Sequence, residues 1–104
     1  MKKNEVSPSE YHSFYQGYMD QVSDDTDLID GYVSGKALAN SFFSNIPEDK
    51  LLYQYDIGKW SIKEVFQHLI DAERVFLHRC FRIARHDATL LSGFDQNDYI
   101  EPSN

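Results

Sequence analysis

The sequence predicts an all-α fold. Over residues 61–86, apolar side chains recur at spacings of three and four, as they do along one face of an amphipathic helix. Neither Gly nor Pro occurs between Trp60 and Arg85. Residues 27–45 show the same spacing, and residues 8–21 have the pattern of a shorter helix. The two longer segments predict a helical hairpin.

The longest predicted helix, residues 61–86, begins with a capping box. Ser61 precedes Glu64 by three residues, so the hydroxyl can accept from a free first-turn amide while the carboxylate accepts from the Ser61 amide. The apolar side consists of Ile62, Val65, Phe66, Leu69, Ala72, Phe76, Cys80 and Ile83. Cys80 is therefore expected to be a buried structural thiol. Glu73 points toward the apolar side, where a carboxylate needs a cationic or hydrogen-bonding partner.

The preceding segments start with similar signals. Ser7 is expected to cap helix 8–21, with Pro8 in its first position. Its aromatic side chains suit a helix that lies across a larger bundle. Acidic and hydroxyl residues at 23–27 favour the positive N-terminus of helix 27–45. Beyond the long helix, residues 87–104 show no periodicity and are expected to form an irregular tail.

Composition excludes several classes of partner. The formal net charge is -7 and the pI is about 4.8, which argues against binding to nucleic acid or to an anionic membrane surface. The single cysteine forms no intrachain disulfide. No signal peptide follows Met1, and no apolar run approaches the length of a membrane span. A cytoplasmic location is expected.

The histidine spacing leaves a metal site open at one position. No two of the four histidines are three or four residues apart, so no pair shares one helical face at ligating distance. Glu64, His68 and Asp71 lie about one turn apart on one shoulder of helix 61–86, where they could ligate or orient a metal. Such residues are also common beside the apolar face of an ordinary amphipathic helix. Spacing alone therefore does not distinguish a metal site from a solvated helix surface.

The residues around the long helix resemble a known family. Gly58-Lys59-Trp60-Ser61-Ile62-Lys63-Glu64, followed by His68-Leu69-Ile70-Asp71-Ala72-Glu73-Arg74, is similar to the signature of the DinB-like (YfiT-like) superfamily, whose members are regarded as metal-dependent hydrolases. Tyr15-Gln16-Gly17-Tyr18 and Gly93-Phe94-Asp95-Gln96-Asn97-Asp98-Tyr99 match one branch of it. Ile57 departs from that branch, which usually has Pro before the Gly-Lys-Trp motif.

The resemblance implies an up-down-down-up four-helix bundle. Three histidines hold a metal there, often nickel or zinc, which can activate a water or a thiol as nucleophile. His68 matches the first ligand, with Glu64 and Asp71 as possible auxiliary groups. The other two ligands belong to a motif on the last helix, and this sequence lacks that motif. We therefore expect residues 1–104 to be a single incomplete domain, the N-terminal half of such a bundle, with no metal and no activity of its own.

Three functional hypotheses follow. In the first, the chain is the N-terminal portion of a metal-dependent hydrolase or transferase and is catalytically silent alone. In the second, it is a non-catalytic module that forms a homodimer through its exposed apolar helix faces and so completes a four-helix bundle. The third, ranked last, is a short enzyme in which His68 works with Glu64 or Asp71 as an acid–base pair. It lacks an identifiable nucleophile and oxyanion donor.

Overall fold

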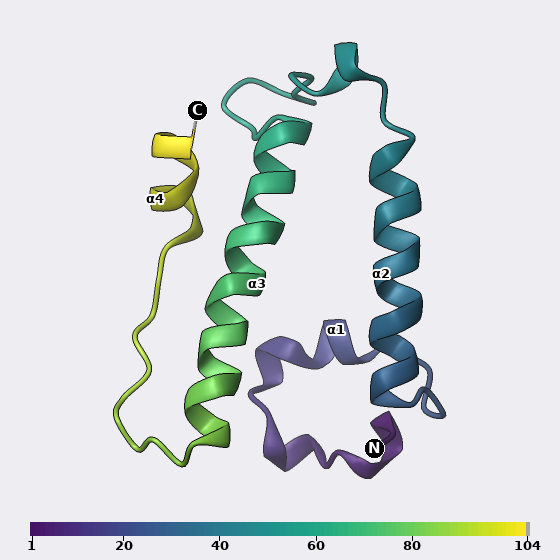
Figure 1. Cartoon of the computed structure of the whole chain (residues 1–104), viewed down its shortest axis with the longest axis vertical. Coiled ribbons are helices and arrows are strands. Elements are labelled where there is room, and N and C mark those ends of the chain that lie inside the picture. Colours follow the sequence, from purple (N-terminus) through teal and green to yellow (C-terminus); the bar gives the residue numbers. More distant parts are fainter. Residues whose placement is uncertain (104) are drawn as a thin grey trace. The chain divides into compact units, whose positions relative to one another are not determined.

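The computed structural model describes residues 1–103, and it confirms the all-α class (Figure 1). Apart from an isolated bridge between Lys2 and Asp27, the regular elements of this range are all helical. The α-helices are α1 (Gln16–Met19), α2 (Leu28–Ser44), α3 (Ile62–Ala84) and α4 (Gln96–Ile100). The chain divides into two compact units, Met1–Ile46 and a second that begins at Pro47. Within the described range, no helix is both long and apolar enough to cross a membrane.

The N-terminal segment differs from the single helix expected over residues 8–21. Instead, 3-10 turns at Pro8–Glu10 and Ser13–Tyr15 precede the one-turn α1. Ser7 caps the first turn as predicted, accepting from the Ser9 amide. The chain then becomes extended at Tyr11 and His12, and His12 Nδ1 accepts from the Phe14 amide (3.1 Å). These local side-chain hydrogen bonds compete with the helical ladder and break it.

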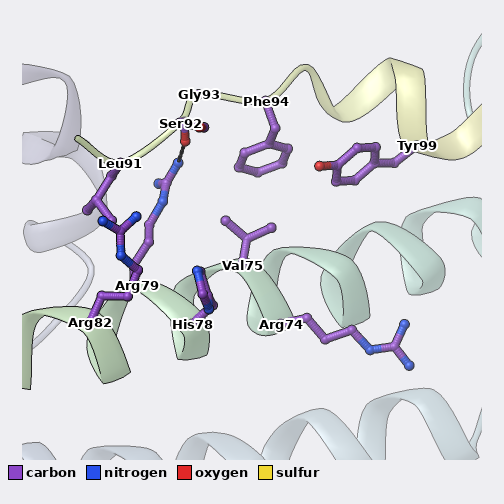
Figure 2. Close-up of a pocket in the computed structure, with 10 residues that line it drawn as sticks. All are labelled: Arg74, Val75, His78, Arg79, Arg82, Leu91, Ser92, Gly93, Phe94 and Tyr99. Carbon is purple, nitrogen blue, oxygen red and sulfur yellow. Dashed lines mark hydrogen bonds between the residues drawn. The ribbon is translucent and has the colours of Figure 1, made fainter. Parts of the chain in front are cut away.

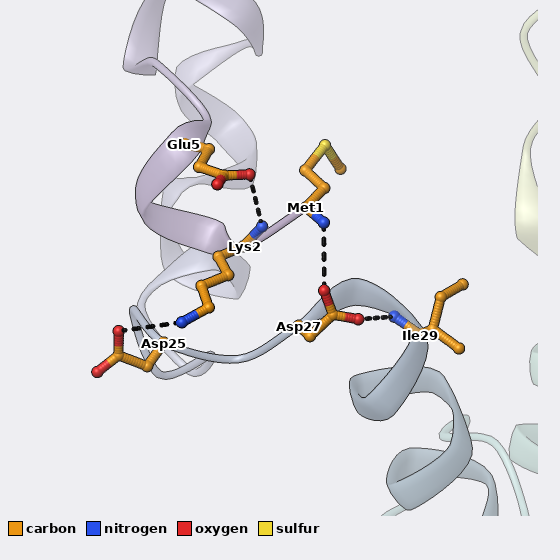
Figure 3. Close-up of polar contacts among 6 residues, drawn as sticks. All are labelled: Met1, Lys2, Glu5, Asp25, Asp27 and Ile29. Carbon is orange, nitrogen blue, oxygen red and sulfur yellow. Dashed lines mark hydrogen bonds and ion pairs between the residues drawn. The ribbon is translucent and has the colours of Figure 1, made fainter.

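The start of the chain is held against the start of α2 (Figure 3). The Met1 ammonium group donates to Asp27 Oδ2 (3.2 Å), and the Leu28 amide donates to the Met1 carbonyl (2.9 Å). The other carboxylate oxygen of Asp27 caps α2 by accepting from the Ile29 amide (2.9 Å). The Ile29 hydrogen bond and then the ammonium group lower the pKa of Asp27. Asp27 therefore both starts α2 and orders the segment before it.

Helix α2 occupies most of the range 27–45 that the sequence indicates for it. Its large apolar side chains are not covered. Tyr32 is 72% exposed, Leu38 73% and Phe42 64%, and Ile29 and Val33 are exposed to a similar extent. The first unit therefore contains no buried core around this helix. Its apolar residues are a surface, as they would be on one element of an incomplete bundle.

The N-terminus of α3 is the most completely bonded helix end in the second unit. The predicted capping box is confirmed: Ser61 Oγ accepts from the Glu64 amide (3.2 Å), and Glu64 Oε2 accepts from the Ser61 amide (2.7 Å). The next two amides, of Ile62 and Lys63, donate to the carbonyls of Tyr53 (3.1 Å) and Leu51 (2.9 Å). These bonds satisfy three first-turn amides that a helix leaves free. Ser61 is only 5% exposed.

Helix α3 ends in a tight reversal. The Asp87 amide donates to the Arg82 carbonyl (3.0 Å) and the His86 amide to the Ile83 carbonyl (3.0 Å), which is the bonding pattern of a Schellman motif. His86 has φ of 54°, in the left-handed region that usually requires glycine at this position. Because no glycine marks this turn, the sequence gives little indication of a reversal here.

The segment after the reversal is ordered, in contrast to the irregular tail expected over 87–104. It returns alongside α3 and ends with α4 and a 3-10 turn at Glu101–Ser103 (Figure 1). Asp95 caps α4 by accepting from the Asn97 amide (2.9 Å). Helix α4 packs on α3, and Ile100 is 4% exposed. Asn104 lies outside the described residues. The single incomplete domain stays a prediction.

Candidate functional site

Two faces of α3 have different environments. One face of α3 carries residues at spacings of seven, four and three, namely His68, Val75, Arg79 and Arg82. These four residues are half-buried. Leu69, Phe76 and Ile83 each follow a residue of that face, so they lie about 100° further round the helix. Their exposed fractions are 46, 48 and 64%. The returning tail covers Val75, Arg79 and Arg82 on the first face, and the apolar face is exposed.

His68 is held mainly by an aromatic contact. Its ring centroid lies 5.1 Å from that of Trp60, at an interplanar angle of 47°. Trp60 immediately precedes the capping residue Ser61, so the fixed start of α3 also places the indole against the second turn of the helix. The imidazole is therefore a half-buried group with a defined neighbour rather than a freely solvated side chain.

The two carboxylates that the sequence places beside His68 are engaged elsewhere. Glu64 Oε2 accepts from both the amide and the hydroxyl of Ser61, at 2.7 and 2.8 Å. The Asp71 oxygens accept from Gln67 Nε2 at 3.0 and 3.1 Å, and Arg74 Nη1 lies 3.4 Å from Asp71 Oδ1. Both groups therefore already have structural partners. As metal ligands they would have to give up or share these contacts.

The described residues do not assemble the ligands of a three-histidine metal site. Nowhere in residues 1–103 do three side chains of His, Cys, Asp or Glu come together as a group that could hold a metal ion. His78 lies on α3 ten residues beyond His68, about 15 Å along the axis, and His86 occupies the reversal. His68 remains the histidine with the most protein around it on α3.

Two expectations about the apolar side of α3 are wrong. Cys80 is exposed, not buried. Glu73 is exposed too, so its carboxylate needs no buried partner. Both expectations assumed that the apolar stripe is packed within the chain. In the structure the returning tail packs against the neighbouring face, and both side chains remain in contact with solvent.

A pocket that the sequence did not indicate lies between α3 and the returning tail (Figure 2). Its volume is about 340 Å³. The helix contributes four basic side chains, Arg74, His78, Arg79 and Arg82, together with Val75. The tail contributes Leu91, Ser92, Gly93, Phe94 and Tyr99. On a helical wheel the basic residues look like an ordinary solvated face. Only the course of the tail, which the sequence pattern does not give, turns this face into a pocket.

Two arginines hold the tail in place. Arg82 Nε donates to Asp87 Oδ2 (2.7 Å), and its Nη2 donates to the Thr89 carbonyl (2.6 Å). Arg79 Nη2 donates to the Ser92 carbonyl (2.9 Å), as the dashed line in Figure 2 shows. These contacts fix the first part of the tail to the last turns of α3. They position the residues that form the outer wall of the pocket.

The ion pair between Arg82 and Asp87 shifts both groups toward their charged forms. The Arg82 hydrogen bond, followed by those from Thr89, holds the pKa of Asp87 far below its ordinary value of 3.8. The carboxylate in turn raises the pKa of Arg82. Because the pKa of Asp87 is lower in the folded than in the unfolded chain, its stabilising effect is complete above pH 3.8. The effect decreases as the pH falls below that value.

We therefore expect the anchoring of the tail to be unchanged between pH 7 and pH 5 and to weaken only in stronger acid. Asp87→Asn should remove this acid-dependent component, because the amide does not titrate. The measurement is the NMR shift of the Phe94 and Tyr99 resonances between pH 7 and pH 2. Asp49→Asn, at a side chain that is 76% exposed and far from the tail in the sequence, is the matched control and should show the same pH dependence as the wild type. Identical acid titrations for the wild type and Asp87→Asn would contradict the assignment.

Comparison with known proteins agrees with the helical elements described above. A family model described as the DinB superfamily matches residues 33–102, which extend from α2 through α3 to the turn after α4. No curated protein and no solved structure matches the chain. The family match covers well over half of the 104 residues. The chain therefore belongs to the DinB superfamily.

Proposed function

We propose that the chain is a helical module of the DinB superfamily that pairs with a second copy to complete a four-helix bundle. The observation that carries this proposal is the exposed apolar surface of the two long helices. On α3 it includes Leu69, Phe76, Leu77 and Ile83, and on α2 it includes Tyr32, Val33, Leu38 and Phe42. Soluble monomers rarely expose contiguous apolar surface of this kind.

The energetics favour assembly. Burying one Leu or Ile side chain contributes about 1.5 kcal/mol or more, and several such residues are exposed on each long helix. A 104-residue chain has only a modest core of its own, and Ile100 is the one apolar residue among those described that is buried. A second copy brings the same exposed faces, and an isologous contact between the two copies would cover the apolar face of α3 on each.

Within this assembly we propose His68 as one ligand of a divalent metal site, with nickel and zinc as the expected ions. Its support is the half-buried position against Trp60, together with the DinB-like signature around it. Glu64 and Asp71 are auxiliary groups in this proposal, and each already has a structural partner. The remaining ligands must come from outside residues 1–103 or from a second copy.

Catalysis by this chain alone is not part of the proposal. A hydrolase or transferase reaction needs a complete metal site, and residues 1–103 contain no cluster that could form one. An acid–base pair of His68 with Glu64 or Asp71 is disfavoured because both carboxylates accept hydrogen bonds from other groups. The proposed role is therefore assembly and contribution of a ligand. The sequence identifies no small-molecule substrate, and the cytoplasmic location remains an expectation.

The dimer is tested with a charged variant of the apolar stripe. Leu69→Lys combined with Ile83→Lys should weaken association about ten-thousandfold, because each substitution occurs in both copies and the four lost apolar contacts together contribute about 6 kcal/mol. Sedimentation velocity over a range of concentrations measures the change. Ile57→Lys combined with Leu90→Lys is the matched control, since these side chains are 97 and 90% exposed outside the long helices. A wild-type chain that sediments as a monomer and melts cooperatively would contradict the proposal.

The ligand assignment is tested separately by nickel binding. We expect His68→Ala to lose most of the nickel that the wild-type protein binds, because the substitution removes the proposed imidazole ligand. Titration calorimetry and native mass spectrometry give the affinity and the stoichiometry. His78→Ala, an exposed histidine on the same helix, should bind nickel like the wild type. Equal nickel binding by His68→Ala and the wild type would exclude His68 as a ligand.

A further inference from the structure

The pocket between α3 and the tail concentrates positive charge in an acidic protein. All four arginines of the chain lie between Arg74 and Arg85, although the formal net charge is -7. Three of them line the pocket together with His78, and no carboxylate contributes to its lining. The pocket lining therefore carries guanidinium groups without a carboxylate among them.

The arginines differ in how far their charge is already neutralised. Arg82 is paired with Asp87, and Arg74 lies near Asp71 and extends away from the other lining residues (Figure 2). Arg79 has only neutral partners among the described residues. Its guanidinium carbon lies 5.5 Å from the Phe76 ring centroid and 5.7 Å from that of Phe94, and Nη2 bonds the Ser92 carbonyl. The Arg79 charge is therefore fixed in place without an anionic partner.

Arg79 also retains the capacity to bind an anion. A guanidinium has five N–H donors, and one hydrogen bond uses only one of them. Its planar fork matches the two oxygens of a carboxylate. The contacts with Ser92 and the two rings restrict the side chain, so less conformational entropy is lost when a ligand binds.

The other side of the pocket is aromatic. Phe94 and Tyr99 stack with centroids 5.5 Å apart and an interplanar angle of 19°. Phe94 projects from the tail toward α3, and Tyr99 extends from α4 toward Phe94 (Figure 2). Val75 lies opposite them on the helix. A volume of about 340 Å³ is at the small end of the range for ligand pockets. The pocket thus combines one fixed cation with a flat apolar wall at the scale of a single-ring molecule.

We infer that this pocket binds a small aromatic carboxylate, with Arg79 at the carboxylate and Phe94 and Tyr99 against the ring. The inference does not involve the proposed metal ligand, because His68 does not line the pocket. It shares one residue with the proposed dimer, because Phe76 on the apolar face of α3 also contacts Arg79. Failure of either earlier proposal would leave this one standing, and the reverse also holds.

The test uses benzoate as the probe with the full chain labelled with nitrogen-15. Benzoate should shift the amide resonances of Arg79, Phe94 and Tyr99. Benzyl alcohol keeps the ring and lacks the charge. It should bind at least about tenfold more weakly than benzoate, because it loses a charge-assisted hydrogen bond. Inorganic phosphate should not displace benzoate at equal concentration. Equal binding of benzyl alcohol, or displacement by phosphate, would overturn the aromatic carboxylate as the ligand.

Two variants locate the site. Arg79→Gln should weaken benzoate binding about tenfold or more, whereas Arg85→Gln should change it less than about twofold. Arg85 is the matched control because it also stacks on an aromatic ring, that of Phe81 (5.5 Å), yet lies outside the pocket. Phe94→Leu retains the hydrogen bond from Arg79 to the Ser92 carbonyl and should also weaken benzoate binding. This second variant tests the site even if Arg79→Gln does not fold. Unchanged affinity in Phe94→Leu, or equal effects of the two arginine variants, would refute the inference.

Discussion

The contacts from α3 to the returning tail are the constraint on which the second unit depends. Arg82 binds Asp87 and Thr89, and Arg79 binds the Ser92 carbonyl. Together with the left-handed turn at His86, they send the chain back along the helix that it has just left. This arrangement covers one face of α3, forms the pocket, and leaves the apolar face exposed. Within the second unit, α3 therefore has one face covered by the tail and one apolar face that is exposed.

The capped start of α3 determines the surroundings of His68. Glu64 holds Ser61, and the start of the helix places Trp60 against His68. The signature shared with the DinB superfamily thus has a structural role in this chain, whether or not a metal is bound. The motif Gly-Lys-Trp-Ser fixes the beginning of a helix and orients one imidazole. Among residues 1–103, no group of three His, Cys, Asp or Glu side chains that could hold a metal ion forms around His68.

Part of this structure could be predicted from the sequence, where local signals decide the outcome. Asp27 and Ser61 mark the starts of α2 and α3, and the motif around Trp60 indicates the family. The break near His12 was not predicted, because its imidazole competes with the helix in a way that periodicity does not reveal. The path of the tail depends on a histidine in a glycine-like conformation and on long-range arginine contacts. The pocket was missed for that reason, and so was the exposure of Cys80 and Glu73.

The central claim is that the apolar face of α3 is the contact with a second copy. Isotope-filtered nuclear Overhauser spectra on a mixture of labelled and unlabelled chains test it most directly. The account predicts contacts between copies at Leu69, Phe76 and Ile83, and none at Val75, which faces the tail of its own chain. Contacts between copies at Val75, or none at the apolar stripe, would contradict it.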